Sequence, residues 1–117
     1  MTKEEIMKFA KDNHVKLSVT WWDEEVWLNR IIIPKAQRGQ GLGGKVIRML
    51  KNYVDARNIP LKLLADSCYG TELEKLKQIY GSLGFKPYKE KGSKSCNYMA
   101  YNLNKSWHNN ISIILFP

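Results

Sequence analysis

A run of closely spaced glycines is the feature that most restricts how this chain can fold. It reads Gln-Arg-Gly-Gln-Gly-Leu-Gly-Gly at residues 37–44, between an apolar segment and an amphipathic one. Residues 26–33 predict a strand ending at Pro34, and the isoleucines at 31–33 predict burial on both of its faces. Residues 45–57 predict a helix, because their apolar residues recur at helical spacing. A glycine-rich turn between strand and helix predicts a phosphate site, since a helix N-terminus offers unpaired N–H groups.

Two common phosphate-binding motifs fit this loop poorly. A Walker A loop needs a Ser or Thr after its lysine to hold magnesium, whereas Lys45 is followed by Val46. A dinucleotide-binding loop needs an initial parallel strand and an acid at the end of the next strand. The nearest acid, Asp66, follows a sheet that begins as a hairpin, so this alternative is also disfavoured.

The whole chain predicts one mixed α+β domain. Thr2 and Glu5 fit a capping box at the start of the first helix, and the acidic run 23–25 fits the turn of an antiparallel hairpin. Thr71 starts a later helix and Gly84 ends it. The expected elements are helices at 3–12, 45–57 and 71–83 and strands at 16–22, 26–33, 61–65, 85–88 and 97–103. A chain of 117 residues has room for one small domain, which we expect at residues 1–103.

The C-terminal tail, residues 104–117, differs from the rest of the chain. It is polar at first and ends in the apolar run 111–116 followed by a proline. Three alternatives stay open for it: an extra strand, an exposed segment, or a contact between the two copies of a homodimer.

The charge of the chain favours anionic ligands without naming one. Nineteen Lys and Arg against eleven Asp and Glu give a net charge of +8, spread evenly along the sequence. An even excess attracts anions of any kind. It lacks the clustered basic stripe of a dedicated nucleic-acid binder, so a phosphate-bearing small molecule suits it equally well.

Neither a membrane segment nor a metal site is expected. No apolar run approaches the ~20 residues that cross a bilayer, and the acidic N-terminus lacks a signal-peptide core, which predicts a cytoplasmic protein. Cys68 and Cys96 lie 28 positions apart, and His14 and His108 have no ligand spacing. These residues predict two reduced thiols and no bound metal.

The glycine-rich loop resembles the coenzyme A loop of the GNAT superfamily of N-acetyltransferases. Residues 38–43 read R-x-x-G-x-G, and they follow an apolar strand and precede an amphipathic helix. A second segment, 73–85, resembles the family's helix ending Y-x-x-x-G-F, with Tyr80, Gly84 and Phe85 at the matching positions. The resemblance covers roughly residues 26–103. It implies a GNAT-like fold with a central, mostly antiparallel twisted sheet and flanking helices.

The resemblance also implies an activity and a set of site residues. Acetyl-CoA would be the cosubstrate, and an acceptor amine would attack its thioester directly. Tyr80 would be the general acid for the leaving thiolate, and Ile31 and Ile33 would pair with the pantetheine through their backbone, the thioester carbonyl being polarised near Ile33. A water or one of the acids at 23–25 would be the base. The pyrophosphate would be held at Arg38, Gly39, Gln40, Gly41, Leu42, Gly43 and Gly44.

The chain departs from the family at its front. The family's first strand and one of its helices are missing, and the position seven residues before the tyrosine, often Asn, is Leu73. The shortness is similar to that of stand-alone members from phage and other mobile elements. We expect an open acceptor groove between the Trp21–Trp27 hairpin and the lysines of 86–94. Such a groove suits a peptide or protein amine better than a polyamine, which the basic rim would repel.

Alternatives of other classes stay open at this point. The chain could be a non-catalytic coenzyme A-binding regulatory module, which its short front favours. It could also be a basic nucleic-acid-binding domain, with tryptophans that stack on bases. At the level of single residues, Tyr80 could be a core aromatic, the acids at 23–25 a solvated turn, and the lysines of 86–94 a solvated face or a site for the coenzyme's 3′-phosphate.

Overall fold

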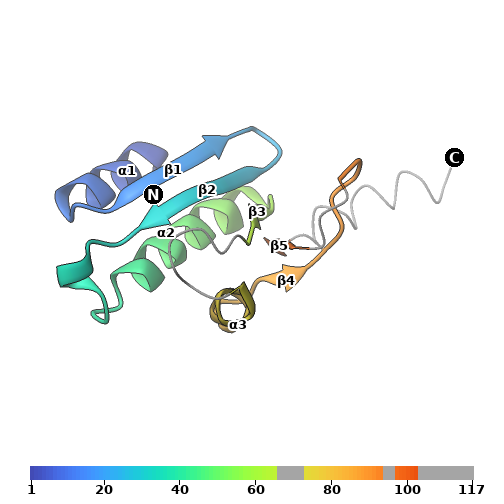
Figure 1. Ribbon diagram of the computed structural model, residues 1–117. Helices are drawn as coiled ribbons and strands as arrows, with labels where there is room; N and C mark the ends of the chain where they lie inside the picture. The colour runs from blue at the N-terminus through green and yellow to red at the C-terminus, as the bar shows by residue number, and fades with distance from the viewer. Residues whose placement is uncertain (66–72, 94–96, 103–117) are drawn as a thin grey trace, which may run out of the picture.

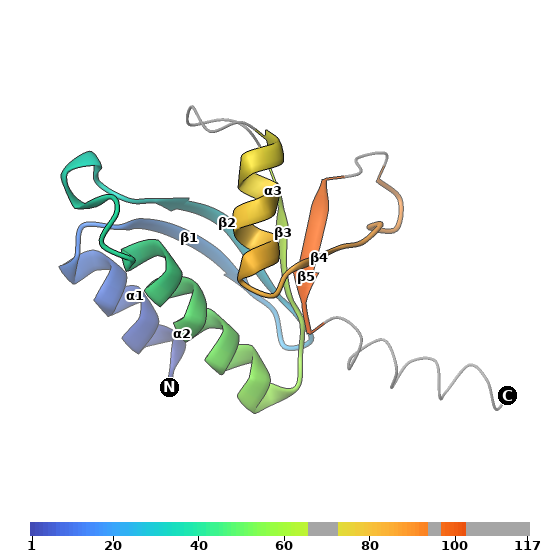
Figure 2. The same ribbon diagram turned by 90° about the horizontal axis from the view of Figure 1, so that it is seen from below.

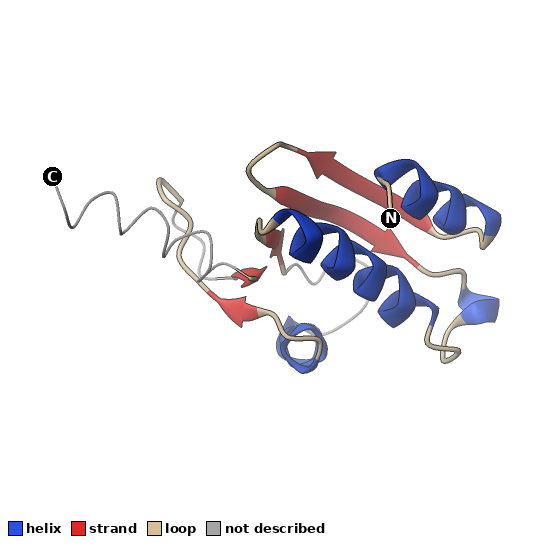
Figure 3. Cartoon of the chain, turned by 180° about the vertical axis from the view of Figure 1, so that it is seen from behind, coloured by secondary structure: helices blue, strands red, loops and turns tan. Residues whose placement is uncertain are grey.

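The computed structural model describes residues 1–65, 73–93 and 97–102, which form three helices and a five-stranded sheet (Figure 1 and, from behind, Figure 3). The sheet order is β1-β2-β3-β5-β4, and β2–β3 is the parallel pair while the other described pairs are antiparallel. The expected mixed α+β fold with a mostly antiparallel sheet is therefore confirmed. The elements are α1 (Lys3–Asp12), β1 (Lys16–Trp21), β2 (Val26–Ile32), the 3₁₀ turn η1 (Lys35–Gln37), α2 (Leu42–Arg57), β3 (Leu61–Leu64), α3 (Leu73–Ser82), β4 (Lys86–Pro87) and β5 (Tyr98–Tyr101).

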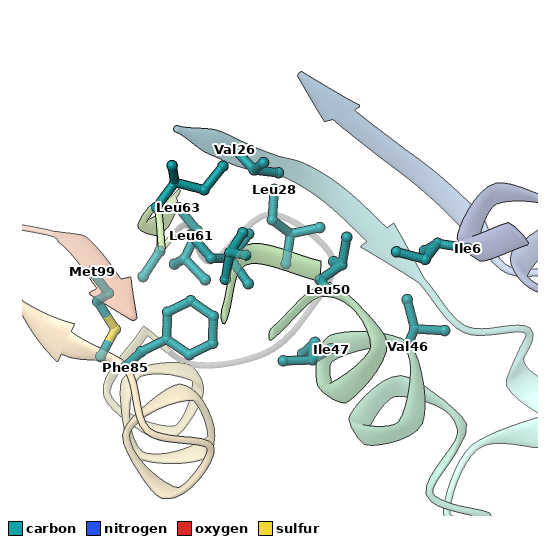
Figure 4. Close-up of a cluster of buried hydrophobic side chains, with 13 residues drawn as sticks. Ile6, Val26, Leu28, Val46, Ile47, Leu50, Leu61, Leu63, Phe85 and Met99 are labelled. Atoms are coloured by element: carbon teal, nitrogen blue, oxygen red, sulfur yellow. The ribbon is translucent and has the colours of Figure 1, made fainter. Parts of the chain in front are cut away.

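The core lies between the sheet and the helices on one of its faces. Alternate residues of β2 and β3 point into it, and the apolar stripe of α2 packs against them (Figure 4). Val26, Leu61 and Leu50 are fully buried there. Phe85 and Met99 extend the core towards β4 and β5. The sheet and α2 therefore form one rigid frame for the segment that joins them.

The start of α2 differs from the expectation. The helix begins at Leu42 rather than Lys45, because Gly41 takes a left-handed conformation with φ of +75° and serves as its N-cap. Two glycines, Gly43 and Gly44, therefore lie inside the first turn. The capping box of Thr2 and Glu5 at the start of α1 is confirmed.

Some expectations fall on parts of the chain outside the description. They are the loop acid Asp66, the helix start at Thr71, the last strand residue Leu103, the thiols of Cys68 and Cys96, and the tail 104–117. No helix within the described ranges is long and apolar enough to cross a membrane.

Candidate functional site

The strands β2 and β3 pair over a short distance and then part. Their parallel register joins Val26–Leu28 to Leu61–Leu63. β1 continues to pair with β2 as far as Ile32, so one edge of β2 stays covered. Figure 2 shows the result as a V, closed at the hairpin end and open towards the glycine-rich loop. Beyond Leu28, no described strand pairs with the edge of β2 that faces the V, so its backbone groups can receive an extended ligand.

This parting of the strands corrects the expected burial of the three isoleucines at 31–33. Ile31, Ile32 and Ile33 are half-buried rather than buried on both faces. The reason is that β2 has a neighbour on both sides only at its first three residues. The apolar run therefore lies on the part of β2 that no longer pairs with β3.

The glycine-rich loop has the geometry of an anion cradle. Gly39 and Gly41 have φ values of +85° and +75°, which side chains with a Cβ rarely adopt. A Cβ added to either glycine would meet no described heavy atom within 4 Å, so the space beside the backbone is open. Lys45 N donates to Gly41 O at 3.0 Å, which places the N–H groups of the preceding helical residues at the open N-terminus of α2. Backbone donors and a positive helix end therefore face free space.

The loop is tied back to the end of β2. Arg38 Nε donates to the carbonyl oxygen of Ile33 at 3.1 Å. A Cβ on Gly43 would lie 3.6 Å from the Ile33 side chain, so the first turn of α2 packs directly on the strand end. The structure thus brings together Ile33, Arg38 and the glycines that the sequence singled out.

The charge around this loop has one sign. Between Glu25 and Asp55 the sequence contains no acidic residue. The segment carries six cationic side chains, and all but Lys51 are exposed. They are Arg30, Lys35, Arg38, Lys45, Arg48 and Lys51. The loop end of β2 and α2 therefore attracts anions more strongly than the rest of the chain.

Tyr80 lies on α3 and combines two features. Its ring is half-buried against the core, with its centroid 5.6 Å from that of Phe85 in an edge-to-face arrangement. A tyrosine hydroxyl is protonated at neutral pH, and burial raises the pKa of the Tyr80 hydroxyl further above its ordinary value. The ring is therefore a core aromatic, and its hydroxyl is in the form that a general acid requires.

The acidic turn lies at the other end of β2. The acids at 23–25 precede β2, whereas the glycine-rich loop follows it. The seven residues of β2, at ~3.3 Å each, separate the two by roughly 20 Å. Asp23 and Glu24 are exposed and, with Glu25 and Trp22, line a pocket of about 520 Å³. The structure therefore does not bring these acids to the end of β2 at Ile33.

Glu25 is engaged in an ionic and aromatic cluster that the sequence did not reveal. Its carboxylate accepts a hydrogen bond from Trp27 Nε1 and lies 3.4 Å from Lys62 Nζ. Lys62 Nζ is also 3.6 Å from Glu90 and lies over the rings of Trp27 and Tyr88 at 5.6 and 5.4 Å. The Lys62 side chain is 12% exposed. We call these five residues the Lys62 cluster, and its contacts make Glu25 a structural partner rather than a free base.

Lys62→Met should destabilise the fold by ~1–2 kcal/mol, because it leaves two partly buried carboxylates without their cation. Lys8→Met is the matched control, since the pair of Lys8 with Asp12 is exposed and should contribute almost nothing to stability. Urea unfolding of both variants measures the difference. Equal losses would contradict a structural role for the cluster.

Stability should fall above pH 10. Burial raises the pKa of the hydroxyls of Tyr80, Tyr88 and Tyr101, and bonds to Glu90 and Asp55 add to the shift for the last two. A raised folded-state pKa leaves stability unchanged below the unfolded value of ~10 and removes it as the pH rises through the folded value. Urea midpoints between pH 8 and 11 test this. Tyr88→Phe should flatten the decline, and an unchanged slope in that variant would contradict it.

Other predicted features lie apart from the loop or outside the description. Lys86, Lys89 and Lys91 are exposed, as expected of a solvated face, and Lys94 is not described. Within the described ranges, no three His, Cys, Asp or Glu side chains group so as to hold a metal ion.

Comparison with known proteins identifies the architecture. No family model matches the sequence, and no curated protein matches it. The anti-CRISPR protein AcrVA5 matches in structure with a TM-score of 0.61 and 19% identity, over 74% of this chain and 88% of its own. A Bacteroides thetaiotaomicron protein assigned to the GNAT family of acetyltransferases matches with a TM-score of 0.54 and 15% identity, over 86% of this chain and 62% of its own.

AtaT is a further structural match. Its complex with acetyl-methionyl-tRNAfMet gives a TM-score of 0.52 and 24% identity, over 74% of this chain and 48% of its own. The chain therefore spans about half of AtaT and less than two thirds of the Bacteroides protein, but most of AcrVA5. The structural matches lead to one conclusion: this chain has the fold of the GNAT acetyltransferases.

Proposed function

We propose that this protein is an N-acetyltransferase that moves an acetyl group from acetyl-CoA directly to a primary amine. One observation carries the proposal: an open glycine cradle stands at the mouth of the V where β2 leaves β3. A cradle alone suits any phosphate ester. A cradle that continues into a strand edge with no described partner strand suits a phosphate ester with a long, amide-bearing arm, as coenzyme A has.

The residues at the cradle fit such a ligand. The N–H groups at residues 39–44 would hold the pyrophosphate, and Arg38, held on the Ile33 carbonyl, would fix the loop against the strand. Backbone groups near Ile31 and Ile33 would pair with the pantetheine along the open edge. The five exposed cationic side chains of the acid-free segment, which exclude Lys51, would balance the phosphate charges.

The transfer step needs little from the protein. The acceptor nitrogen forms a bond to the acetyl carbon, the carbon–sulfur bond breaks, and the electron pair leaves with sulfur. Tyr80 donates its hydroxyl proton to that thiolate, and the surplus proton of the amine passes to water. Because a thiol is a good leaving group, the contribution of Tyr80 is modest compared with that of positioning the two substrates.

The acceptor is a peptide or protein amine in our primary proposal, because the exposed Lys86, Lys89 and Lys91 would repel a small polycation such as a polyamine. An amine carried on RNA is the second candidate. It is supported by the complex of AtaT with acetyl-methionyl-tRNAfMet and by the acid-free cationic segment of this chain. An assay with equal concentrations of a lysine peptide pool, aminoacyl-tRNA, spermidine and an aminoglycoside separates these classes. Faster acetylation of either polycation would contradict both candidates and point to the acids at 23–25 as part of the acceptor site.

Two measurements test the activity itself. Thermal unfolding with and without acetyl-CoA tests binding, and release of free thiol in the presence of the amine panel tests transfer. The proposal expects both signals. A thermal shift without thiol release would favour a non-catalytic coenzyme A-binding module. Absence of both, with a shift on adding nucleic acid, would favour a nucleic-acid-binding domain.

A further inference from the structure

A lysine on α2 contacts the end of the helix that carries Tyr80. Lys51 Nζ donates to the carbonyl oxygen of Leu83 at 2.6 Å. The same ammonium lies 4.6 Å from the centroid of the Tyr101 ring. Lys51 is half-buried, and 32 positions separate it from Leu83 in the sequence. Figure 2 shows the corresponding arrangement, with the C-terminal end of α3 beside the middle of α2.

The carbonyl that Lys51 contacts belongs to the turn that closes α3. Leu83 N and Phe85 N both donate to the carbonyl oxygen of Tyr80, at 3.0 and 3.1 Å. Gly84, between them, has a φ of +97° and ends the helix. The last carbonyls of a helix have no partner within it, so a lysine that reaches one of them holds the helix end in place. Residues 80–85 are therefore one hydrogen-bonded unit, and Lys51 fixes it from outside.

The helix that carries Lys51 is the helix that begins at the glycine cradle. Lys51 lies nine positions after Leu42, the first residue of the helix, which is roughly 13 Å along the axis. One rigid element thus connects the proposed phosphate site to the turn that holds the proposed acid. The ring of Phe85 packs edge-to-face on that of Tyr80 and adds a second contact within the same turn.

We propose that Lys51 is a positioning residue that sets the Tyr80 hydroxyl relative to the coenzyme cradle. The inference rests on the proposed function. It goes beyond a stabilising role, because a contact that only stabilises the fold would not act on turnover through Tyr80. Loss of the contact leaves the cradle at the far end of α2 intact and releases the turn from the helix.

Lys51→Met removes the ammonium and keeps the length of the side chain. We expect kcat to fall about 10-fold, while KM for acetyl-CoA stays within about twofold of the wild-type value. Lys51→Gln, whose amide is too short to reach the Leu83 carbonyl, should behave in the same way and serves if the first variant does not fold. Tyr101→Phe is the matched control. It keeps the ring under Lys51 but loses the 2.7 Å bond of its hydroxyl to Asp55, so it should lower the melting temperature and leave kcat unchanged.

A double-mutant cycle with Tyr80→Phe decides between positioning and stability. If Lys51 acts through the Tyr80 hydroxyl, adding Lys51→Met to the Tyr80→Phe variant, which already lacks that hydroxyl, should change kcat less than about twofold. The inference would be overturned by a folded Lys51→Met variant with unchanged kcat, or by an equal loss of kcat with and without the Tyr80 hydroxyl. Either result would leave the proposed function standing. A wild-type protein that neither shifts with coenzyme A nor releases thiol would overturn the proposed function, and the inference with it.

Discussion

Gly41→Val should abolish the stabilisation that coenzyme A gives to the wild-type protein. At one hundred times its Kd, a ligand that binds only the folded state stabilises it by ~2.7 kcal/mol. Gly41 is the N-cap of α2 and has a φ of +75°, and the space that a Cβ would occupy there is open. A branched side chain would fill that space and distort the backbone donors beside it. Coenzyme A should therefore no longer raise the melting temperature.

The backbone strain of that substitution needs its own control, and Gly92 provides it. Gly92 lies in the turn between β4 and β5 and has a φ of +81°, and a Cβ there would also meet no described heavy atom within 4 Å. Gly92→Val should lower the melting temperature by a similar amount and keep the full shift with coenzyme A. A folded Gly41→Val variant that also keeps the shift would show that the cradle is assigned to the wrong glycines.

Tyr80→Phe should lower turnover by up to ~100-fold without weakening coenzyme binding. The substitution keeps the ring, its contact with Phe85 and its place against the core, and it removes the hydroxyl alone. A proton donor contributes to kcat and not to the affinity for the acetyl donor, so kcat should fall while the Kd for coenzyme A stays unchanged. Steady-state rates of thiol release, with Kd from calorimetry, measure both.

A purely structural role for Tyr80 predicts the opposite result. If Tyr80 only completes the core, Tyr80→Phe changes the free energy of unfolding slightly and leaves kcat at the wild-type level. Tyr101→Phe controls for the loss of a tyrosine hydroxyl elsewhere in the fold, because its partner Asp55 lies on the exposed side of α2. Wild-type turnover in a folded Tyr80→Phe protein would exclude the acid role.

Local sequence patterns predicted most of the fold. The capping box of α1, the β1–β2 hairpin and the order of the elements follow from short-range periodicity and turn chemistry, which a sequence displays directly. The start of α2 did not follow. Glycines count against a helix interior, so the pattern favoured a start at Lys45. The structure begins the helix at Leu42, because Gly41 supplies a left-handed N-cap that propensity does not reveal.

The candidate site was predictable as a loop but not as a parting of two strands. The glycine spacing marked residues 38–44, and the structure leaves open space beside Gly39 and Gly41. Three isoleucines in a row suggested a central strand with two neighbours, whereas β3 accompanies β2 for three residues only. Strand divergence depends on the path of the whole sheet, and no local pattern records it.

Contacts between distant residues could not be predicted at all. Lys51 and Lys62 look like ordinary cations in the sequence, yet one reaches the Leu83 carbonyl and the other lies between two carboxylates. Each contact joins segments that only the folded chain brings together. The sequence also left Tyr80 undecided between core and catalysis. The structure places its ring against the core, and its catalytic role stays a prediction.

The central claim is that acetyl-CoA binds at the cradle and along the open edge of β2. Titration of ¹⁵N-labelled protein with acetyl-CoA tests it most directly, because each backbone N–H reports its own surroundings. The account predicts that the amide signals of residues 39–44 shift most, that those of Ile31 and Ile33 follow, and that the signal of Gly92 stays in place. Shifts confined to the hairpin turn at 23–25, or no shifts at saturating acetyl-CoA, would contradict it.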